Sequence, residues 1–172
     1  LKKAEAFTRG YRKVILVSLE LWYTEIEELV SNSPKDWIWV LRPHPGTKDH
    51  YDEMREFFRT VHPNVEMNLA IELPLHVLIL VADIHISWFS TCALECLPFG
   101  VKTIFIHPSA KVMYNEFITS GRMVYVEHPL DAIELIESSE PLENIQQDSY
   151  ATFSGNDDTR KACEFLKCRG DD

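Results

Sequence analysis

Short apolar runs alternate with amphipathic stretches along most of the chain. The runs at 13–19 and 37–41 are almost unbroken, as is typical of strands that are covered on both faces. Similar runs follow, and we predict strands at 13–19, 37–41, 65–67, 83–87, 101–106 and 123–127. The stretches between them repeat apolar residues at helical spacing, and we predict helices at 22–30, 50–61, 73–81, 114–120, 129–137, 142–153 and 159–167.

Prolines decide two of these assignments. By spacing alone the run at 73–81 fits a strand or a helix. Pro74 at a first helical position favours the helix, and so does the crossover that a parallel sheet needs between two strands. Two prolines around His44 predict an extended turn at 42–46 and no helix before about Lys48.

The alternation of strands and helices predicts the fold class. About six repeats of this kind give a parallel sheet with right-handed crossovers, so we expect a doubly wound, Rossmann-like α/β domain with helices on both faces. We assign 13–140 to this domain, 1–12 to a linker or connecting helix, and 141–172 to C-terminal helices that pack on or extend from it. Ligands bind such sheets beyond the carboxyl ends of the strands, where the strand order reverses. The candidate loops are 18–20, 42–46, 87–91 and 107–109.

The central stretch, 83–105, combines a strand, a Ser/Thr turn and a helix that begins at Cys92 and is expected to end near Pro98–Gly100. Such a turn gathers backbone N–H groups at a helix start, which suits an anion. Ser90 and Thr91 are candidate phosphate ligands, although, taken alone, these two residues are better explained as an ordinary N-cap.

Three further residues are candidates for the same site. Glu95, one turn into the helix, is placed to bind two hydroxyls of a ribose, or simply to complement the helix dipole. Arg42 and Ser18, at the ends of the first two strands, are further phosphate-binding candidates.

His44 is the catalytic candidate. It lies between two prolines at the end of a predicted strand, beside Arg42. A histidine held by a rigid turn can donate a hydrogen bond to a phosphate oxygen, or act as an acid toward a leaving phosphate. The alternative is a turn histidine that only satisfies backbone carbonyls.

Composition narrows the class of partner. The 172 residues are 45% hydrophobic, enough for a packed core, and carry a net charge of −10, which argues against nonspecific nucleic-acid binding. No apolar run approaches the roughly 18–20 residues of a membrane span, and the first residues lack a signal-peptide core. We expect a cytoplasmic protein, or one peripheral to the inner face of the membrane. The chain begins without Met, as a domain cut from a larger protein would.

Metal and cofactor motifs are not found. The four cysteines form no CxxC pair, and the spacing of Cys92 and Cys96 fits buried apolar positions better than half a metal site; the other two are Cys163 and Cys168. The sequence has no HxH, HExxH, GxGxxG, GxxxxGK[ST] or GxSxG pattern. We therefore expect no metal and no cofactor, with the cysteines reduced.

Three segments together resemble the carboxyl-terminal, donor-binding half of GT-B glycosyltransferases. They are R-P-H-P-G at 42–46, A-D-I-H-I-S-W-F-S-T-C-A-L-E at 82–95 and F-G-V-K-T-I-F-I at 99–106. The likeness spans about 13–137. It is greatest to the bacterial capsule, sialyl- and polysialyltransferase and CDP-glycerol glycerophosphotransferase groups, which carry an HP motif followed by a Ser/Thr-rich motif.

The resemblance implies roles for individual residues. His44 matches the HP histidine, which contacts the donor phosphates and assists departure of the leaving group. Ser90 and Thr91 match the motif that cradles the phosphates, and Glu95 is similar in place to the acid that binds the donor ribose. The donor would be a nucleotide-activated sugar, and no metal would be obligatory.

The sequence departs from that family in two respects. Trp88 and Phe89 stand where polar or small residues often precede the serines, which changes the expected shape of the pocket. The N-terminal acceptor domain, which normally supplies the general base, is missing from this sequence. We therefore expect a donor-binding half of a glycosyltransferase of surface polysaccharide synthesis that is inactive by itself.

Two alternatives share the fold class. A non-hydrolysing UDP-sugar 2-epimerase is one, although the acidic and arginine residues of such sites are not recognisable here. The other is a non-enzymatic interaction domain, such as a receiver-like domain. A receiver needs an acidic pair after the first strand and a lysine after the fifth, whereas this chain has 18–20 (Ser-Leu-Glu) and 107–108 (His-Pro) there.

Overall fold

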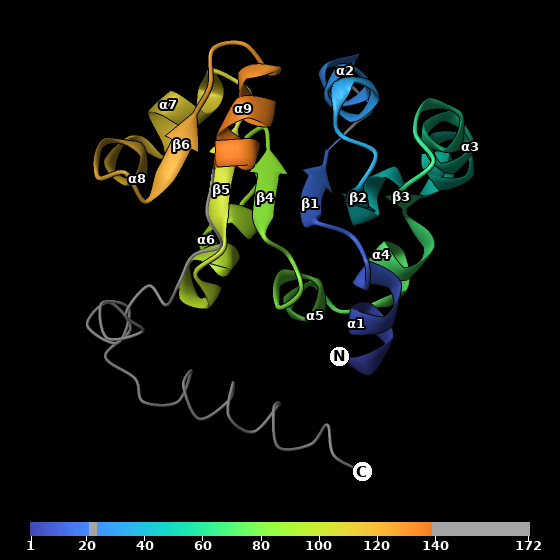
Figure 1. Ribbon diagram of the computed structural model, residues 1–172. Coiled ribbons are helices and arrows are strands. Elements are labelled where there is room, and N and C mark those ends of the chain that lie inside the picture. The colour runs from blue at the N-terminus through green and yellow to red at the C-terminus, as the bar shows by residue number, and fades with distance from the viewer. Residues whose placement is uncertain (21–23, 139–172) are drawn as a thin grey trace.

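A six-stranded, all-parallel sheet forms the centre of the molecule (Figure 1). The computed structural model describes residues 1–20 and 24–138. The strand order is β3-β2-β1-β4-β5-β6, so the order reverses between β1 and β4. The strands are β1 (Lys13–Leu19), β2 (Trp37–Pro43), β3 (Val65–Glu66), β4 (Ile84–Ser87), β5 (Lys102–Phe105) and β6 (Met123–Tyr125). The predicted fold class is confirmed, and each predicted strand is found.

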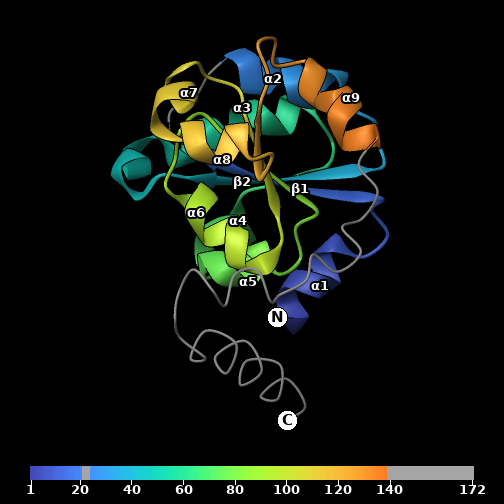
Figure 2. The ribbon, with the colours of Figure 1, turned by 90° about the vertical axis from the view of Figure 1, so that its left-hand side faces the viewer.

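Helices cover both faces of this sheet (Figure 2). They are α1 (Lys2–Thr8), α2 (Thr24–Asn32), α3 (Tyr51–Val61), α4 (Asn68–Glu72), α5 (Leu75–Ile79), α6 (Cys92–Cys96), α7 (Ser109–Met113), α8 (Asn115–Thr119) and α9 (Asp131–Ser138), with 3-10 turns η1 (Pro45–His50) and η2 (Leu97–Phe99). One face packs against α2, α3 and α9, and the other against α1, α4, α5 and α6. The predicted helices at 142–153 and 159–167 lie outside the described residues.

The two faces of β1 explain its unbroken apolar run. Ile15 and Val17 face the α2, α3 and α9 side, whereas Val14 and Leu16 face the opposite layer, and all four are buried. The first of these cores also contains three tryptophans, each at most 1% exposed: Trp37, Trp39 and Trp88. A strand with no solvent-facing side has no polar alternation, and this is why its sequence reads as continuous.

Two boundaries differ from the sequence prediction at the HP segment. β2 continues through Arg42 and Pro43, which pair with Ser18 and Leu19 of β1 instead of turning away. η1 begins at Pro45, so the expectation of no helix before Lys48 was wrong. Proline lacks a backbone N–H, but the end of a strand and the first turn of a helix do not need that donor for their own hydrogen bonds. Both positions therefore tolerate proline.

Several helices were also bounded differently. The helix predicted at 73–81 is confirmed as α5, but Pro74 is its N-cap residue and not its first helical position. The short helices α4 and α7 were not predicted, because five residues give too little periodicity to identify. The helix beginning at Cys92 ends as expected, with η2 closed by Gly100 at φ 72°.

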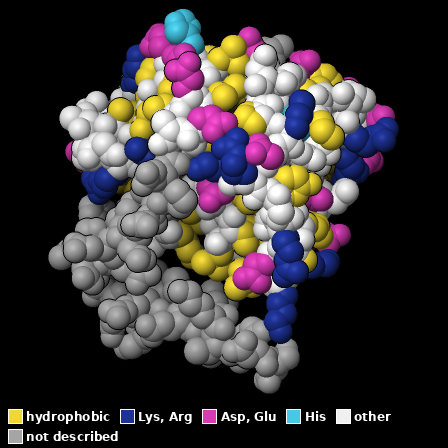
Figure 3. Space-filling model, viewed as in Figure 1, with side chains coloured by type: hydrophobic (Ala, Val, Ile, Leu, Met, Phe, Trp, Pro, Cys, Tyr) yellow, Lys and Arg dark blue, Asp and Glu magenta, His cyan; other side chains and the backbone are white. Residues whose placement is uncertain are grey.

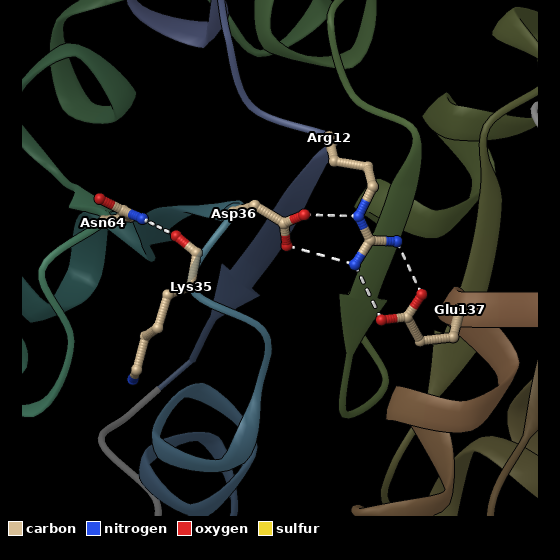
Figure 4. A network of polar contacts seen from close by, with 5 residues as sticks. All are labelled: Arg12, Lys35, Asp36, Asn64 and Glu137. Atoms are coloured by element: carbon tan, nitrogen blue, oxygen red, sulfur yellow. Dashed lines mark hydrogen bonds and ion pairs between the residues drawn. The ribbon is translucent and has the colours of Figure 1, made fainter.

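An arginine joins three segments at the amino edge of the sheet (Figure 4). The guanidinium of Arg12 donates from Nε to Asp36 Oδ2 at 2.6 Å and from Nη1 to Glu137 Oε2 at 2.7 Å. These hydrogen bonds raise the pKa of Arg12 and lower the pKa values of both carboxyls. The entries to β1 and β2 are thereby tied to the end of α9. Acidic and basic side chains are also interspersed over the face of the molecule shown in Figure 3.

Candidate functional site

The candidate site is the carboxyl edge of the sheet at the point where the strand order reverses. β1 lies between β2 and β4, so Ser18 has Arg42 on one side and Ser87 on the other. The loop containing His44 follows β2, and the Ser/Thr turn follows β4. Because both flanking strands pair with β1, the two loops begin about 10 Å apart, two strand spacings.

The loop around His44 is fixed by its own hydrogen bonds. The His44 N–H donates to the carbonyl of Leu19 at 2.8 Å, and its carbonyl accepts from the N–H and the hydroxyl of Thr47 and from the hydroxyl of Tyr51. Its ring Nδ1 accepts the N–H of Gly46 at 3.0 Å. The side chain is exposed on a backbone that is already held.

The Ser/Thr turn is held by hydrogen bonds with Ser87 at the end of β4 and with Tyr114. Ser87 Oγ accepts the N–H of Ser90 at 2.9 Å, and Ser90 Oγ accepts the N–H of Cys92 at 3.4 Å. The Tyr114 hydroxyl donates to the carbonyls of Phe89 and Ser90, each at 3.1 Å. Thr91 is the N-cap residue of α6 by position, but its side chain makes no capping hydrogen bond and is exposed. The Ser90 hydroxyl therefore does the local capping, and Thr91 faces solvent.

Trp88 does not line the candidate site, although the sequence led us to expect that it changes the shape of the pocket. Its side chain is 1% exposed and packs into the core beneath α2, α3 and α9. Phe89 is half-buried and meets the ring of His107 edge-on at 5.5 Å between centroids. Phe89 and His107 thus pack together where β4 and β5 end at the carboxyl edge of the sheet.

Arg42 lies at the edge but is already engaged. Its Nη1 donates to the carbonyls of Ala70 at 2.5 Å and Leu73 at 2.7 Å, where α4 ends. This contact holds the α4 to α5 connection against β2. Glu95 lies in the first turn of α6 and is exposed.

Ser18 belongs to a buried polar chain that the sequence did not reveal. Its Oγ lies 2.8 Å from Nε2 of His85, whose Nδ1 lies 3.0 Å from Oγ1 of Thr103. Burial lowers the pKa of His85 to about 3, so the ring is neutral. The thiol of Cys96 also contacts Thr103, and burial raises its pKa to about 12. His85 alternates with Ile84 and Ile86, a pattern typical of a solvated face, yet here α6 covers that face.

Metal ligation finds little support in the described part of the chain. Within it, no three His, Cys, Asp or Glu side chains come together as a metal site would require. Cys92 and Cys96 are free thiols, and Cys163 and Cys168 lie outside the described residues. Over the same residues, every helix is too short or too polar to cross a bilayer.

The fold and its edge define a doubly wound α/β domain of the Rossmann type. Solved structures that share this fold include the C-terminal CMP-Kdo binding domain of WaaA from Acinetobacter baumannii. It is 14% identical, with a TM-score of 0.59, and the match covers 80% of this chain and 86% of that one.

Two longer proteins match over a comparable share of this chain. Wall teichoic acid polymerase TagF with CDPG is 14% identical, with a TM-score of 0.55, over 88% of this chain and 39% of its own. UDP-GlcNAc 2-epimerase from Neisseria meningitidis with UDP-GlcNAc is 17% identical, with a TM-score of 0.56, over 80% and 40% respectively. This chain therefore spans about two fifths of each of these proteins, and at such identities the likeness is one of fold.

No protein-family model matches the sequence, and no curated protein matches it either.

Proposed function

We propose that this chain is the donor-nucleotide-binding half of a GT-B glycosyltransferase that acts in surface polysaccharide synthesis. The observation that carries the proposal is the placement of two motifs at one edge. The loop of His44 and the turn of Ser90 and Thr91 leave the strands on either side of β1, where the strand order reverses. A phosphate or diphosphate over the end of β1 would lie between them.

The side chains at this edge suit an activated sugar donor. The His44 ring donates to one phosphate oxygen, and the hydroxyls of Ser90 and Thr91 donate to others. Glu95, exposed in the first turn of α6, accepts from the ribose hydroxyls. Such donors stabilise the charge that develops on a leaving phosphate without an obligatory metal.

Arg42 and Ser18 remain phosphate-binding candidates of a second kind. Arg42 already donates to two carbonyls through Nη1, and Ser18 already contacts His85. Arg42 would contribute its remaining guanidinium N–H groups and its positive charge, and Ser18 would contribute its hydroxyl.

The fold supports this proposal through the proteins that share it. The WaaA domain is described as binding CMP-Kdo, and TagF was solved with CDPG. The proposal includes a second, acceptor-binding domain, the general base that this domain supplies, and a cytoplasmic location.

A thermal-shift panel with CMP, CDP, UDP and GDP tests the proposal. A ligand that binds only the folded protein raises its melting temperature, by more the further its concentration exceeds the dissociation constant, so one or more nucleotides should shift the transition. Adenosine at the same concentration is the control, because it offers a ribose without a phosphate. No shift with any nucleotide at millimolar concentration would contradict the proposal.

A UDP-sugar 2-epimerase is the second candidate, because the Neisseria epimerase shares the fold with a similar TM-score of 0.56. The two candidates differ in what the complete protein does with its donor. A transferase releases the nucleotide when an acceptor is present, whereas an epimerase interconverts UDP-sugars without an acceptor. Proton NMR of UDP-GlcNAc incubated with the complete protein separates them.

A further inference from the structure

Gly46 lies unusually close to the imidazole of His44. A Cβ built on Gly46 would lie 3.0 Å from His44 Nδ1 and 3.3 Å from Cε1. Among the described residues, the glycines with positive φ are Gly10, Gly100 and Gly121, so Gly46 is not required for its backbone conformation. The absent side chain is what allows the ring to lie against the loop.

The hydrogen bond at this contact fixes the tautomer of the ring. The N–H of Gly46 donates to His44 Nδ1 at 3.0 Å, and an N–H can donate only to a nitrogen that carries no proton. A neutral imidazole has one proton, which must then be on Nε2. Pro45 helps because it has no N–H of its own to compete for the ring.

Two other His-Pro turns show that the hydrogen bond alone does not require glycine. His62 Nδ1 accepts the N–H of Asn64 at 3.0 Å, and His107 Nδ1 accepts the N–H of Ser109 at 3.2 Å. Both donors carry a Cβ. Position 46 differs in that a Cβ there would lie 3.0 Å from Nδ1 of the ring as the structure places it, so glycine permits this position of the His44 ring.

We propose that Gly46 is a positioning residue that holds the exposed His44 imidazole with its proton on Nε2, so that the ring meets an anionic oxygen as a hydrogen-bond donor. The proposal rests on the proposed function for the identity of the anion, a nucleotide phosphate. With its proton on Nε2, the ring donates a hydrogen bond to the phosphate, which is the first of the two roles that the sequence left open.

The tautomer can be measured in the empty protein. Long-range ¹H–¹⁵N correlation spectra at mildly alkaline pH distinguish the two neutral forms by the shifts of the ring nitrogens. We expect the wild-type His44 ring to carry its proton on Nε2, and Gly46→Ala to give a mixture of both forms. The rings of His62 and His107, which keep their own donors, should be unchanged and serve as internal controls.

Nucleotide affinity tests the consequence. Gly46→Ala and His44→Ala should each weaken the tightest-binding nucleotide of the panel about tenfold, the scale of one hydrogen bond to a charged group. If Gly46 acts through the ring, the double variant should bind no more weakly than His44→Ala alone. His44→Gln, whose amide reaches about as far as Nε2, should retain more affinity than His44→Asn, which reaches only as far as Nδ1.

The outcomes separate this inference from the proposed function. If wild type binds a nucleotide and Gly46→Ala binds it equally well, or if the two alanine effects simply add, the positioning role is wrong and the function stands. If wild type binds no nucleotide, the function fails, and the spectra still decide the role of Gly46. A wild-type ring protonated on Nδ1, or an unchanged tautomer in Gly46→Ala, would overturn the inference in either case.

Discussion

Ser33 connects the end of α2 to the core through a single hydroxyl. Its Oγ donates to the carbonyl of Val30 and accepts the indole N–H of Trp39, each at 2.8 Å, and the residue is 5% exposed. We expect Ser33→Ala to lower the free energy of unfolding by about 1–3 kcal/mol, because a buried indole N–H loses its partner. Urea denaturation measures this. Ser31→Ala, which removes an exposed hydroxyl that donates to the Glu27 carbonyl, should change it by less than about 0.5 kcal/mol.

His44 is expected to behave in the opposite way, with a large effect on binding and a small one on stability. Its backbone carries the loop hydrogen bonds, and its side chain is exposed. His44→Ala should weaken nucleotide binding by roughly 1–3 kcal/mol and leave the melting temperature of the empty protein nearly unchanged. Calorimetric titration of both proteins decides the matter. Equal affinity, or a variant that unfolds, would make His44 a structural turn residue.

At the scale of elements, Gly100 ends the segment formed by α6 and η2. It has φ 72°, and nothing lies within 4 Å of where a Cβ would be. We therefore expect Gly100→Ala to cost about 1–2 kcal/mol of unfolding free energy from backbone strain alone, without a steric clash. Gly46→Ala is the matched comparison, because that position lacks positive φ and its substitution should act mainly on the His44 ring. Equal losses of stability in the two variants would contradict this division.

The elements that could be predicted from the sequence are those with a strong pattern. β1 is bounded as expected because both of its faces are buried, which leaves an uninterrupted apolar run. β2 was predicted two residues too short, because Arg42 and Pro43 look like a turn and their pairing with β1 depends on a distant segment. The five-residue helices α4 and α7 were not predicted, because five residues span little more than one helical turn and repeat no pattern.

The same distinction applies to the candidate site. The HP loop and the Ser/Thr turn were recognisable because each is a contiguous motif, and the strand order places both at one edge. The contacts of Arg42 with α4 and of Ser18 with His85 were not, because their partners are 28 and 67 residues away in sequence. His85 looked like the polar side of a half-exposed strand, and only tertiary packing buries it. The roles of these residues toward a nucleotide remain predictions.

For the whole molecule, His85 should make stability depend on pH. Its pKa falls from 6.5 to about 3 on folding because of burial. Between these two pH values, the unfolded chain therefore binds a proton at His85 that the folded chain does not bind. This contribution is complete above pH 6.5 and is lost as the pH falls toward 3, at up to about 1.4 kcal/mol per pH unit. Burial lowers the pKa of His62 as well, and its effect has the same sign.

Denaturation curves across this pH range test the assignment. His85→Gln keeps hydrogen-bonding groups in the strand but does not titrate, so its stability should fall less steeply between pH 6.5 and the carboxyl range. His62→Gln is the matched control and should flatten the curve by a smaller amount, since that ring is less deeply buried. Parallel curves for wild type and His85→Gln would show that another group controls the acid response.

The isolated chain should bind nucleotides weakly and transfer little or no sugar. One sheet domain accounts for the described residues, and this chain spans 39% of TagF. In the proposed architecture the opposite wall of the cleft and the general base belong to another domain. A radiolabelled donor assay with residues 1–172 and with the complete protein measures the difference. Robust transfer by residues 1–172 alone would show that the second domain is not needed.

The buried tryptophans give the protein an internal optical reporter. Trp37 and Trp39 lie with their ring centroids 6.5 Å apart, and Trp88 enters the same core directly before the Ser/Thr turn. Rings shielded from water in this way emit at short wavelength, and the emission moves to longer wavelength when the core opens. The fluorescence of a Trp88-only variant would therefore follow folding, and it would also register a nucleotide that displaces Phe89 and Ser90.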